Sequence, residues 1–406
     1  MSTRVWRAVR AVLAGLVVTA ALAPTPARAA AAPAPARIET FDVATRLVDP
    51  SSPGGILQKR RTSPRVHVLL PEGYDDHPGE RYPVLWLLHG ANGGTDSWLS
   101  SIKKLAAGLP AVIVMPDGGQ FGMYMDWWNG GTRGGPAWAT FHLQVLRQKI
   151  EERYRIRPER RWHAIAGISM GGQGALRYAA LLPGYFGSVA GFSAALPNMR
   201  TPEAEVGLGV LTSAGGAVGV TYDAVYGPPT APYARGTNPQ DLVTNYEHSR
   251  IFLTSGLGAH CPQDPIPQTL AIDTITETFI HLQQGPFAAA ARNAGADVTP
   301  QTTCGSHTFG VWDRAFAAAR AWGFFEPVPE APHRWTYRTI ATTGEAWGLR
   351  FRFAQPPSNV VVLRRAGDAL RVSGHGRLEL RGPEGCHVEL DLPYDGRLPA
   401  ACSSPV

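Results

Sequence analysis

Between residues 38 and 329, short apolar runs alternate with longer segments in which apolar residues recur every three or four positions. The short runs are predicted to be strands, and their uninterrupted apolar character indicates that both of their faces are covered. The predicted strands are Arg65–Leu70, Pro83–Leu88, Ala111–Met115, Trp162–Ile168, Ser188–Phe192 and Ile251–Thr254, and the more polar Asp297–Thr303 is also strand-like. The predicted helices are Trp138–Tyr154, Leu270–Ala294 and Phe309–Trp322. This alternation predicts an α/β fold with a mainly parallel sheet.

Two further regions depart from this alternation. Residues Pro197–His248 are rich in Gly, Ala, Pro and Thr and show no clear period. We therefore expect an irregular segment that forms a lid or a wall of a pocket. From Glu330 to Val406 apolar and polar residues alternate, as at Leu349, Phe351 and Phe353, which predicts a small antiparallel β-domain. A domain that binds glycan or wall polymer and a packing module without a ligand both fit this pattern.

The first 29 residues have the pattern of a secretory signal peptide. Three arginines precede the apolar run Ala11–Ala23, which is shorter than the ~20 residues that a membrane-spanning helix needs. Ala27 and Ala29 then place small side chains at the positions that a signal peptidase reads. We therefore expect cleavage near Ala29 and a secreted protein without stable membrane insertion. An Ala/Pro linker over residues 30–37 would then lead into the main domain, residues 38–329.

Charge and cysteine content limit the classes of partner. Removal of the signal peptide lowers the formal charge from +6 to +2, and no Lys/Arg cluster interleaved with aromatic residues remains. Nucleic acid is therefore not an expected partner. Four cysteines in an exported protein favour two disulfides, and the pairs Cys261–Cys304 and Cys386–Cys402 keep each bridge within one domain. The sequence has neither a CxxC pair nor an HExxH motif, so we expect no metal site.

The chemistry of the chain is indicated first by the sequence Gly167-Ile168-Ser169-Met170-Gly171, which follows a predicted strand and opens a predicted helix. In this setting a G-x-S-x-G sequence is typical of the nucleophile elbow of an α/β-hydrolase fold. The small residues on either side of the serine let the backbone make the sharp turn that exposes its hydroxyl. Ser169 is therefore the predicted nucleophile.

The base and the acid are expected later in the chain, because in this fold they follow the nucleophile. His307 lies between a predicted strand and a predicted helix and is the preferred base, with His260 as its main rival. Asp264, Asp273 and Glu277 are the candidate acids, and their spacing alone does not choose among them.

An oxyanion hole requires two backbone N–H groups that point at the developing negative charge. One should belong to Met170, the residue directly after the nucleophile. The other should come from the Gly-rich turn after the strand that ends at Leu88, where Ala91 is the preferred donor.

These residues resemble the esterase family that contains S-formylglutathione hydrolases, feruloyl esterases and mycolyltransferases of the antigen 85 type. The resemblance spans about residues 38–325 and omits the C-terminal β-domain. It is carried by the elbow, Val114-Met115-Pro116, Gly118-Gly119-Gln120, Tyr124, Asp126-Trp127, and His307 followed by Trp312. These enzymes place their catalytic glutamate ten residues before a phenylalanine that matches Phe287. The resemblance therefore implies Glu277 as the acid, in preference to Asp264.

The resemblance also bears on the substrate, with Asn92, Trp127 and Trp312 as the expected contacts. Around the oxyanion loop the mycolyltransferases carry an acid and an arginine that hold trehalose, whereas this chain has His89 and Asn92. Water is therefore the expected acceptor.

The sequence thus predicts a secreted serine esterase without a cofactor, which cleaves small-molecule or cell-wall carboxylic esters through an acyl-enzyme on Ser169. Acyl transfer to a sugar or glycerol hydroxyl is the alternative. A non-catalytic wall-binding or glycan-binding protein is less favoured, because such a protein has no need of an intact Ser–His pair.

Overall fold

The computed structural model describes residues 34–48, 63–128, 136–214, 220–228, 231–383 and 385–402. The predicted signal peptide and residues 30–33 of the predicted linker lie outside this part of the chain.

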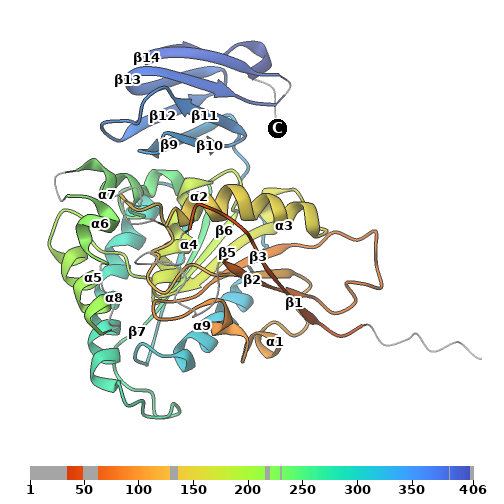
Figure 1. Cartoon of the computed structure of the whole chain (residues 1–406), viewed down its shortest axis with the longest axis vertical. Coiled ribbons are helices and arrows are strands. Elements are labelled where there is room, and N and C mark those ends of the chain that lie inside the picture. Colours follow the sequence, from red (N-terminus) through yellow and green to blue (C-terminus); the bar gives the residue numbers. More distant parts are fainter. Residues whose placement is uncertain are drawn as a thin grey trace, which may run out of the picture. The chain divides into compact units, whose positions relative to one another are not determined.

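The described residues contain an eight-stranded sheet with the order β1-β2-β4-β3-β5-β6-β7-β8 (Figure 1). β2 is antiparallel to both β1 and β4, whereas every other neighbouring pair in this sheet is parallel. The strands are β1 (Arg37–Asp42), β2 (Arg65–Leu70), β3 (Val84–Leu88), β4 (Val112–Pro116), β5 (His163–Ile168), β6 (Ser188–Phe192), β7 (Arg250–Gly256) and β8 (Asp297–Thr303).

Helices connect these strands and cover the sheet. The α-helices are α1 (Ile102–Leu105), α2 (Trp138–Thr140), α3 (Arg147–Arg153), α4 (Met170–Leu181), α5 (Glu203–Ala214), α6 (Tyr222–Tyr226), α7 (Pro232–Thr237), α8 (Leu270–Asn293) and α9 (Phe309–Trp322). The shorter helical turns are η1 (Thr95–Trp98), the π-helix η2 (Phe141–Leu146), η3 (Arg160–Trp162), η4 (Val243–Tyr246) and η5 (Ala400–Cys402).

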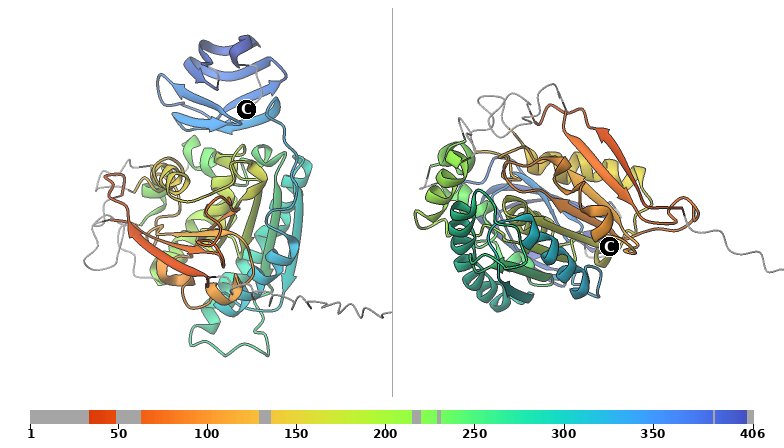
Figure 2. Two further views of the ribbon diagram at one scale, coloured as in Figure 1. Left: turned by 90° about the vertical axis from the view of Figure 1, so that its right-hand side faces the viewer. Right: turned by 90° about the horizontal axis from the view of Figure 1, so that it is seen from below.

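Two apolar cores lie on opposite faces of the main sheet, and β3 contributes to both. Trp86 packs in the core that includes α2, α4 and α8, whereas Leu85 and Leu87 pack in the core that includes α1 and α9. Figure 2 shows the helices on both sides of the sheet. This two-sided burial explains why β3 and β4 are apolar at every position, as the sequence pattern predicts. The edge strand β8 is an exception, since most of its residues are polar and only Val298 is buried.

The C-terminal residues form a second, antiparallel sheet with its own core. Its strands are β9 (Arg334–Thr339), β10 (Thr343–Ala346), β11 (Leu349–Phe353), β12 (Val361–Ala366), β13 (Ala369–Arg381) and β14 (His387–Arg397). Within the described residues the order is β10-β11-β13-β12-β9, and β14 pairs with β13. Leu349, Phe351 and Phe353 are buried while Arg350 and Arg352 are exposed, which confirms the predicted alternation.

The fold class is as predicted: a mainly parallel α/β sheet accompanied by an antiparallel C-terminal sheet. The helices predicted at Leu270–Ala294 and Phe309–Trp322 are confirmed to within one residue. The helix predicted over Trp138–Tyr154 is a continuous helical run, but its middle third is a π-helix, which the apolar spacing did not reveal.

The prediction that Pro197–His248 is irregular was wrong, because the segment contains α5, α6, α7 and η4. Except for α5, these helices have six residues or fewer, which is too short to produce a clear apolar period.

Among all the described residues, no helix combines the length and the apolar character needed to cross a membrane.

Candidate active site

Ser169 occupies the turn between β5 and α4 with φ 53° and ψ −118°. A positive φ is strained for a residue with a side chain. The turn is possible because its flanking residues are glycines. A Cβ on Gly167 would lie 2.3 Å from the carbonyl oxygen of Gly171, and a Cβ on Gly171 would lie 2.4 Å from that of His89. The structure therefore has the strand–turn–helix geometry of a nucleophile elbow.

Three side chains from separate parts of the chain form a continuous hydrogen-bonded series. The Oγ atom of Ser169 lies 2.9 Å from Nε2 of His307, and Nδ1 of His307 lies 2.6 Å from Oε2 of Glu277. Glu277 is fully buried on α8, and Ser169 is 6% exposed. Because a carboxylate accepts hydrogen bonds, Nδ1 of His307 carries the proton toward Glu277 and Nε2 accepts from the serine hydroxyl.

The other carboxylate oxygen of Glu277 has partners that the sequence did not suggest. Oε1 accepts hydrogen bonds from the hydroxyl of Ser193 at 2.7 Å and from the N–H of Gly256 at 2.5 Å. The hydroxyl of Ser193 in turn accepts the indole N–H of Trp312 at 3.1 Å. Ser193 and Gly256 stand at the carboxyl ends of β6 and β7, where functional groups gather in open α/β sheets, and this placement is the signal that could have found them.

The rival residues are engaged elsewhere. Asp264 forms a two-pronged ion pair with Arg314 at 2.6 and 2.9 Å, which lowers the pKa of Asp264. Asp273 accepts the hydroxyl of Thr269 at 2.7 Å. His260 does not take the place of His307 beside the serine, since it is His307 that contacts Ser169. Of the three candidate acids, Glu277 alone meets the imidazole with its side chain.

The predicted oxyanion donors lie on the two sides of Ser169. Met170 is the first residue of α4, where backbone N–H groups have no partner within the helix. On the other side, a Cβ on Gly90 would lie 3.5 Å from the Cβ of Ser169, so the turn that carries Ala91 packs directly against the serine. Ala91 and Ser169 line the same cavity. This arrangement suits two N–H groups that converge on one oxygen.

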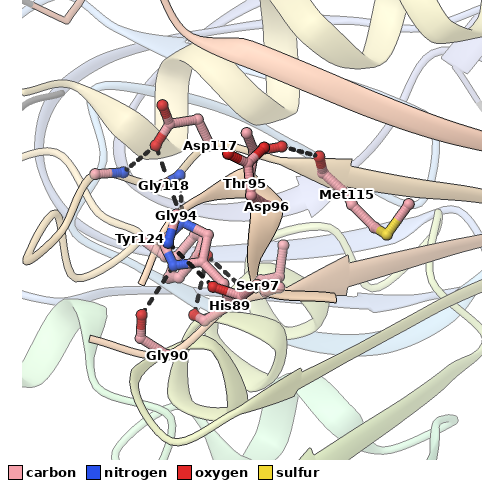
Figure 3. Close-up of polar contacts among 12 residues, drawn as sticks. His89, Gly90, Gly94, Thr95, Asp96, Ser97, Met115, Asp117, Gly118 and Tyr124 are labelled. Atoms are coloured by element: carbon pink, nitrogen blue, oxygen red, sulfur yellow. Dashed lines mark hydrogen bonds and ion pairs between the residues drawn. The ribbon is translucent and has the colours of Figure 1, made fainter. Parts of the chain in front are cut away.

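The turn is held from behind by the buried side chain of His89 (Figure 3). Its Nε2 accepts the N–H of Gly118 at 2.9 Å, which leaves Nδ1 to donate to the carbonyl oxygen of Gly90 at 2.8 Å. The backbone N–H of His89 also donates to the hydroxyl of Tyr124 at 3.0 Å. Burial lowers the pKa of His89, consistent with a neutral ring that accepts at Nε2.

The cavity above Ser169 has a volume of about 600 Å³. Its lining residues come from the oxyanion turn, the elbow, the start of α8 and the His307 loop: Gly90, Ala91, Asn92, Gly93, Ser97, Ile168, Ser169, Pro267, Thr269, Ile272, Asp273, Thr276, His307, Thr308, Phe309 and Trp312. None of the described residues of 197–248 is among them, so the prediction that this segment forms a pocket wall is not supported. The wall formed by residues 267–276 was missed.

The three expected substrate contacts have different positions. Asn92 lines the cavity with φ 57°, and its side-chain oxygen accepts the amide of Gln120 at 2.9 Å. Trp312 also lines the cavity, and its ring meets that of His307 edge-on at 4.9 Å. Trp127 does not line the cavity: it is 4% exposed and donates its indole N–H to Gly122. The prediction for Trp127 is therefore corrected, because its indole serves the core.

The position of His89 also changes the comparison with the trehalose-binding enzymes. Its ring is 1% exposed and does not line the cavity, so it cannot contact an acceptor. Of the two positions at which this chain differs from the mycolyltransferases around the oxyanion turn, only Asn92 lines the cavity.

Both predicted disulfides are present. Cys261–Cys304 joins the segment after β7 to the His307 loop, with a Cα–Cα distance of 5.4 Å and a sequence separation of 43. Cys386–Cys402 lies within the C-terminal sheet region, with a Cα–Cα distance of 4.7 Å. In the part of the chain that the structure describes, no group of three or more His, Cys, Asp or Glu residues could hold a metal ion.

Comparisons with known proteins agree with this geometry. The chain is 36% identical over 255 residues to "Esterase Rv1288" of Mycobacterium tuberculosis, an alignment that covers 61% of this chain and 53% of that protein. It is 27% identical over 249 residues to the "Diacylglycerol acyltransferase/mycolyltransferase Ag85A" of Mycobacterium leprae, covering 58% of this chain and 72% of that one. The chain spans about half the length of the curated esterase that it matches.

The fold is similar to that of an S-formylglutathione hydrolase from Agrobacterium tumefaciens. The TM-score is 0.52 at 16% identity, and the match covers 71% of this chain and 94% of that one. A family model described as "Putative esterase" matches residues 58–322, which is more than half of the chain. The chain therefore belongs to this esterase family.

Proposed function

We propose that this protein is a secreted serine esterase that cleaves carboxylic esters through an acyl-enzyme on Ser169. The observation that carries the proposal is the unbroken series of hydrogen bonds from Ser169 through His307 to the buried Glu277, at the base of an open cavity. A hydroxyl, an imidazole and a carboxylate in this order form the arrangement that activates a serine for acyl transfer.

The reaction follows from the positions of these groups. The Ser169 hydroxyl attacks the ester carbonyl carbon while Nε2 of His307 takes its proton, and the N–H groups of Ala91 and Met170 hold the oxyanion. Glu277 keeps the imidazole in the required tautomer and stabilises its protonated form. His307 then gives the proton to the leaving alcohol, which leaves the acyl group on Ser169. Water attacks this ester with His307 again as base, releasing the acid and restoring the serine.

Water is the proposed acceptor, although the similarity to Ag85A makes acyl transfer the second candidate. The cavity side of the oxyanion turn presents an asparagine, Asn92, whose oxygen is already engaged by Gln120. A neutral amide in this place forms no charge-assisted hydrogen bonds with a sugar, whereas an acid and an arginine would form such bonds.

The proposal also includes the export of the protein and the role of the C-terminal sheet. The basic and apolar start of the sequence supports a signal peptide cleaved near Ala29, and the two disulfides suit an oxidising compartment. The C-terminal sheet has exposed polar side chains on one face, as in β11 and β13, and we include contact with glycan through this face in the proposal.

A panel of p-nitrophenyl esters of rising acyl length, each with and without excess trehalose or glycerol, tests this function. We expect free acid as the main product throughout, with less than a tenth of the acyl groups on trehalose, on the order of a 1.4 kcal/mol preference for water. Acyl-trehalose as the main product would show a transferase instead. The absence of turnover with every ester would favour a non-catalytic binding protein.

A further inference from the structure

Helix α8 carries an apolar stripe on its solvent side. Ile272, Ile275, Phe279 and Leu282 follow the spacing of one helix face, and the three aliphatic members are 50%, 65% and 67% exposed. Single exposed apolar side chains are ordinary, but a contiguous group is not. Of the eight large apolar side chains that the described residues expose, six lie between Leu257 and Phe309.

The stripe continues onto a neighbouring helix. A Cβ on Gly207 of α5 would lie 3.4 Å from the ring of Phe279, and the adjacent Val206 is 56% exposed. Figures 1 and 2 show α5 and α8 side by side. The apolar surface therefore extends across two helices.

The surface around the stripe carries no basic side chain. Neither residues 257–291 nor helix α5 contains a lysine or an arginine. The acidic residues of these two segments are Asp264, Asp273, Glu277, Glu203 and Glu205, of which Asp264 is paired with Arg314, Glu277 is buried beside His307, and Glu205 is exposed next to Val206. Helix α3, Arg147–Arg153, shows the composition that is usual for a helix at the surface. Charged residues occupy five of its seven positions. The stripe thus fits an uncharged apolar partner and offers no basic side chain to an anionic one.

The stripe is also continuous with the cavity over Ser169. Ile272 belongs to both, and Phe309, another residue that lines the cavity, is 43% exposed. An object held against the stripe would therefore lie directly at the entrance to the candidate active site.

We propose that the stripe of α8, with Val206 of α5, docks the enzyme on an uncharged lipid–water interface, so that an ester in that interface enters the cavity beside Ile272. The delivery of an ester to the cavity rests on the proposed esterase function, whereas the docking on lipid can occur without turnover. Apolar side chains at this spacing gain free energy when they enter the boundary between headgroups and acyl chains, and because the surface has no Lys or Arg, anionic lipid is expected to add no attraction.

The test measures sedimentation with phosphatidylcholine vesicles in a Ser169→Ala background, so that no substrate is consumed. The protein is collected from an exporting host and its N-terminus is read by mass spectrometry, since the apolar run at Ala11–Ala23 would itself bind lipid. Ile275→Gln/Leu282→Gln is expected to lower the partition coefficient by about tenfold or more. Glutamine suits an exposed helix position at least as well as isoleucine, so the fold is expected to persist.

Ala317→Gln is the matched control, since it adds the same side chain at an exposed position of α9 on the other face of the sheet. It is expected to bind vesicles like the parent. With Ser169 restored, the stripe variant should hydrolyse dissolved p-nitrophenyl butyrate like the parent but lose most of its activity on emulsified long-chain esters.

Four results would overturn the docking surface. They are equal vesicle binding by the stripe variant, a parent that binds only anionic vesicles, loss of hydrolysis of the dissolved ester in the variant, or a parent that self-associates through the stripe in sedimentation velocity. If the parent hydrolyses no ester at all, the esterase proposal fails, while the vesicle measurement still decides the docking.

Discussion

Replacing Ser169 with alanine is expected to lower kcat for p-nitrophenyl butyrate by about 10⁴-fold or more, because the attacking oxygen is lost. Ser169 Oγ is the atom that the elbow places 2.9 Å from Nε2 of His307. Alanine keeps the Cβ, so it meets the positive φ of this turn with the same backbone cost as serine. The measurement is steady-state turnover together with thermal unfolding, which should be close to that of the parent. Retention of a tenth of the parental kcat would remove Ser169 from the mechanism.

The second large effect is expected at Glu277, where glutamine should lower kcat by about 10⁴-fold. The amide can present only one oxygen to the three donors that now surround the carboxylate, namely Nδ1 of His307, the hydroxyl of Ser193 and the N–H of Gly256. The imidazole then loses the partner that sets its tautomer and stabilises its positive charge.

Asp264→Asn is the matched comparison for Glu277→Gln, since it makes the same chemical change in the acid that the sequence left as the alternative. It weakens an ion pair with Arg314 away from the imidazole, so kcat should change by less than about tenfold. Denaturant unfolding of both variants separates a loss of fold from a loss of chemistry. A crippled Asp264→Asn beside a mild Glu277→Gln would reverse the assignment of the acid.

Much of the fold was readable because the central parallel strands are buried on both faces. Their apolar runs are continuous, as in β3 and β4. The elbow geometry at Ser169 was readable for a related reason. The turn at Ser169 needs glycines two positions before and after it, and this local requirement is visible in the sequence as the G-x-S-x-G motif.

The carboxylate that contacts His307 was not readable from spacing, since Asp264, Asp273 and Glu277 all lie within one segment. The choice depends on how α8 packs against β7, which buries Glu277 and leaves Asp273 at the cavity. The same limit applies to Trp127, because an indole in a motif gives no indication of whether it faces the cavity or the core. Whether such a side chain faces the cavity or the core is decided by packing between segments far apart in the chain. A single sequence shows only the preferences of neighbouring residues.

The most direct measurement is mass spectrometry of an acid-quenched reaction with a p-nitrophenyl ester, followed by proteolysis and peptide sequencing. The proposed mechanism predicts that the mass of the acyl group is added to Ser169 during turnover and disappears when the ester is exhausted. Continued turnover with Ser169 unmodified, or with the acyl group on another residue, would contradict it.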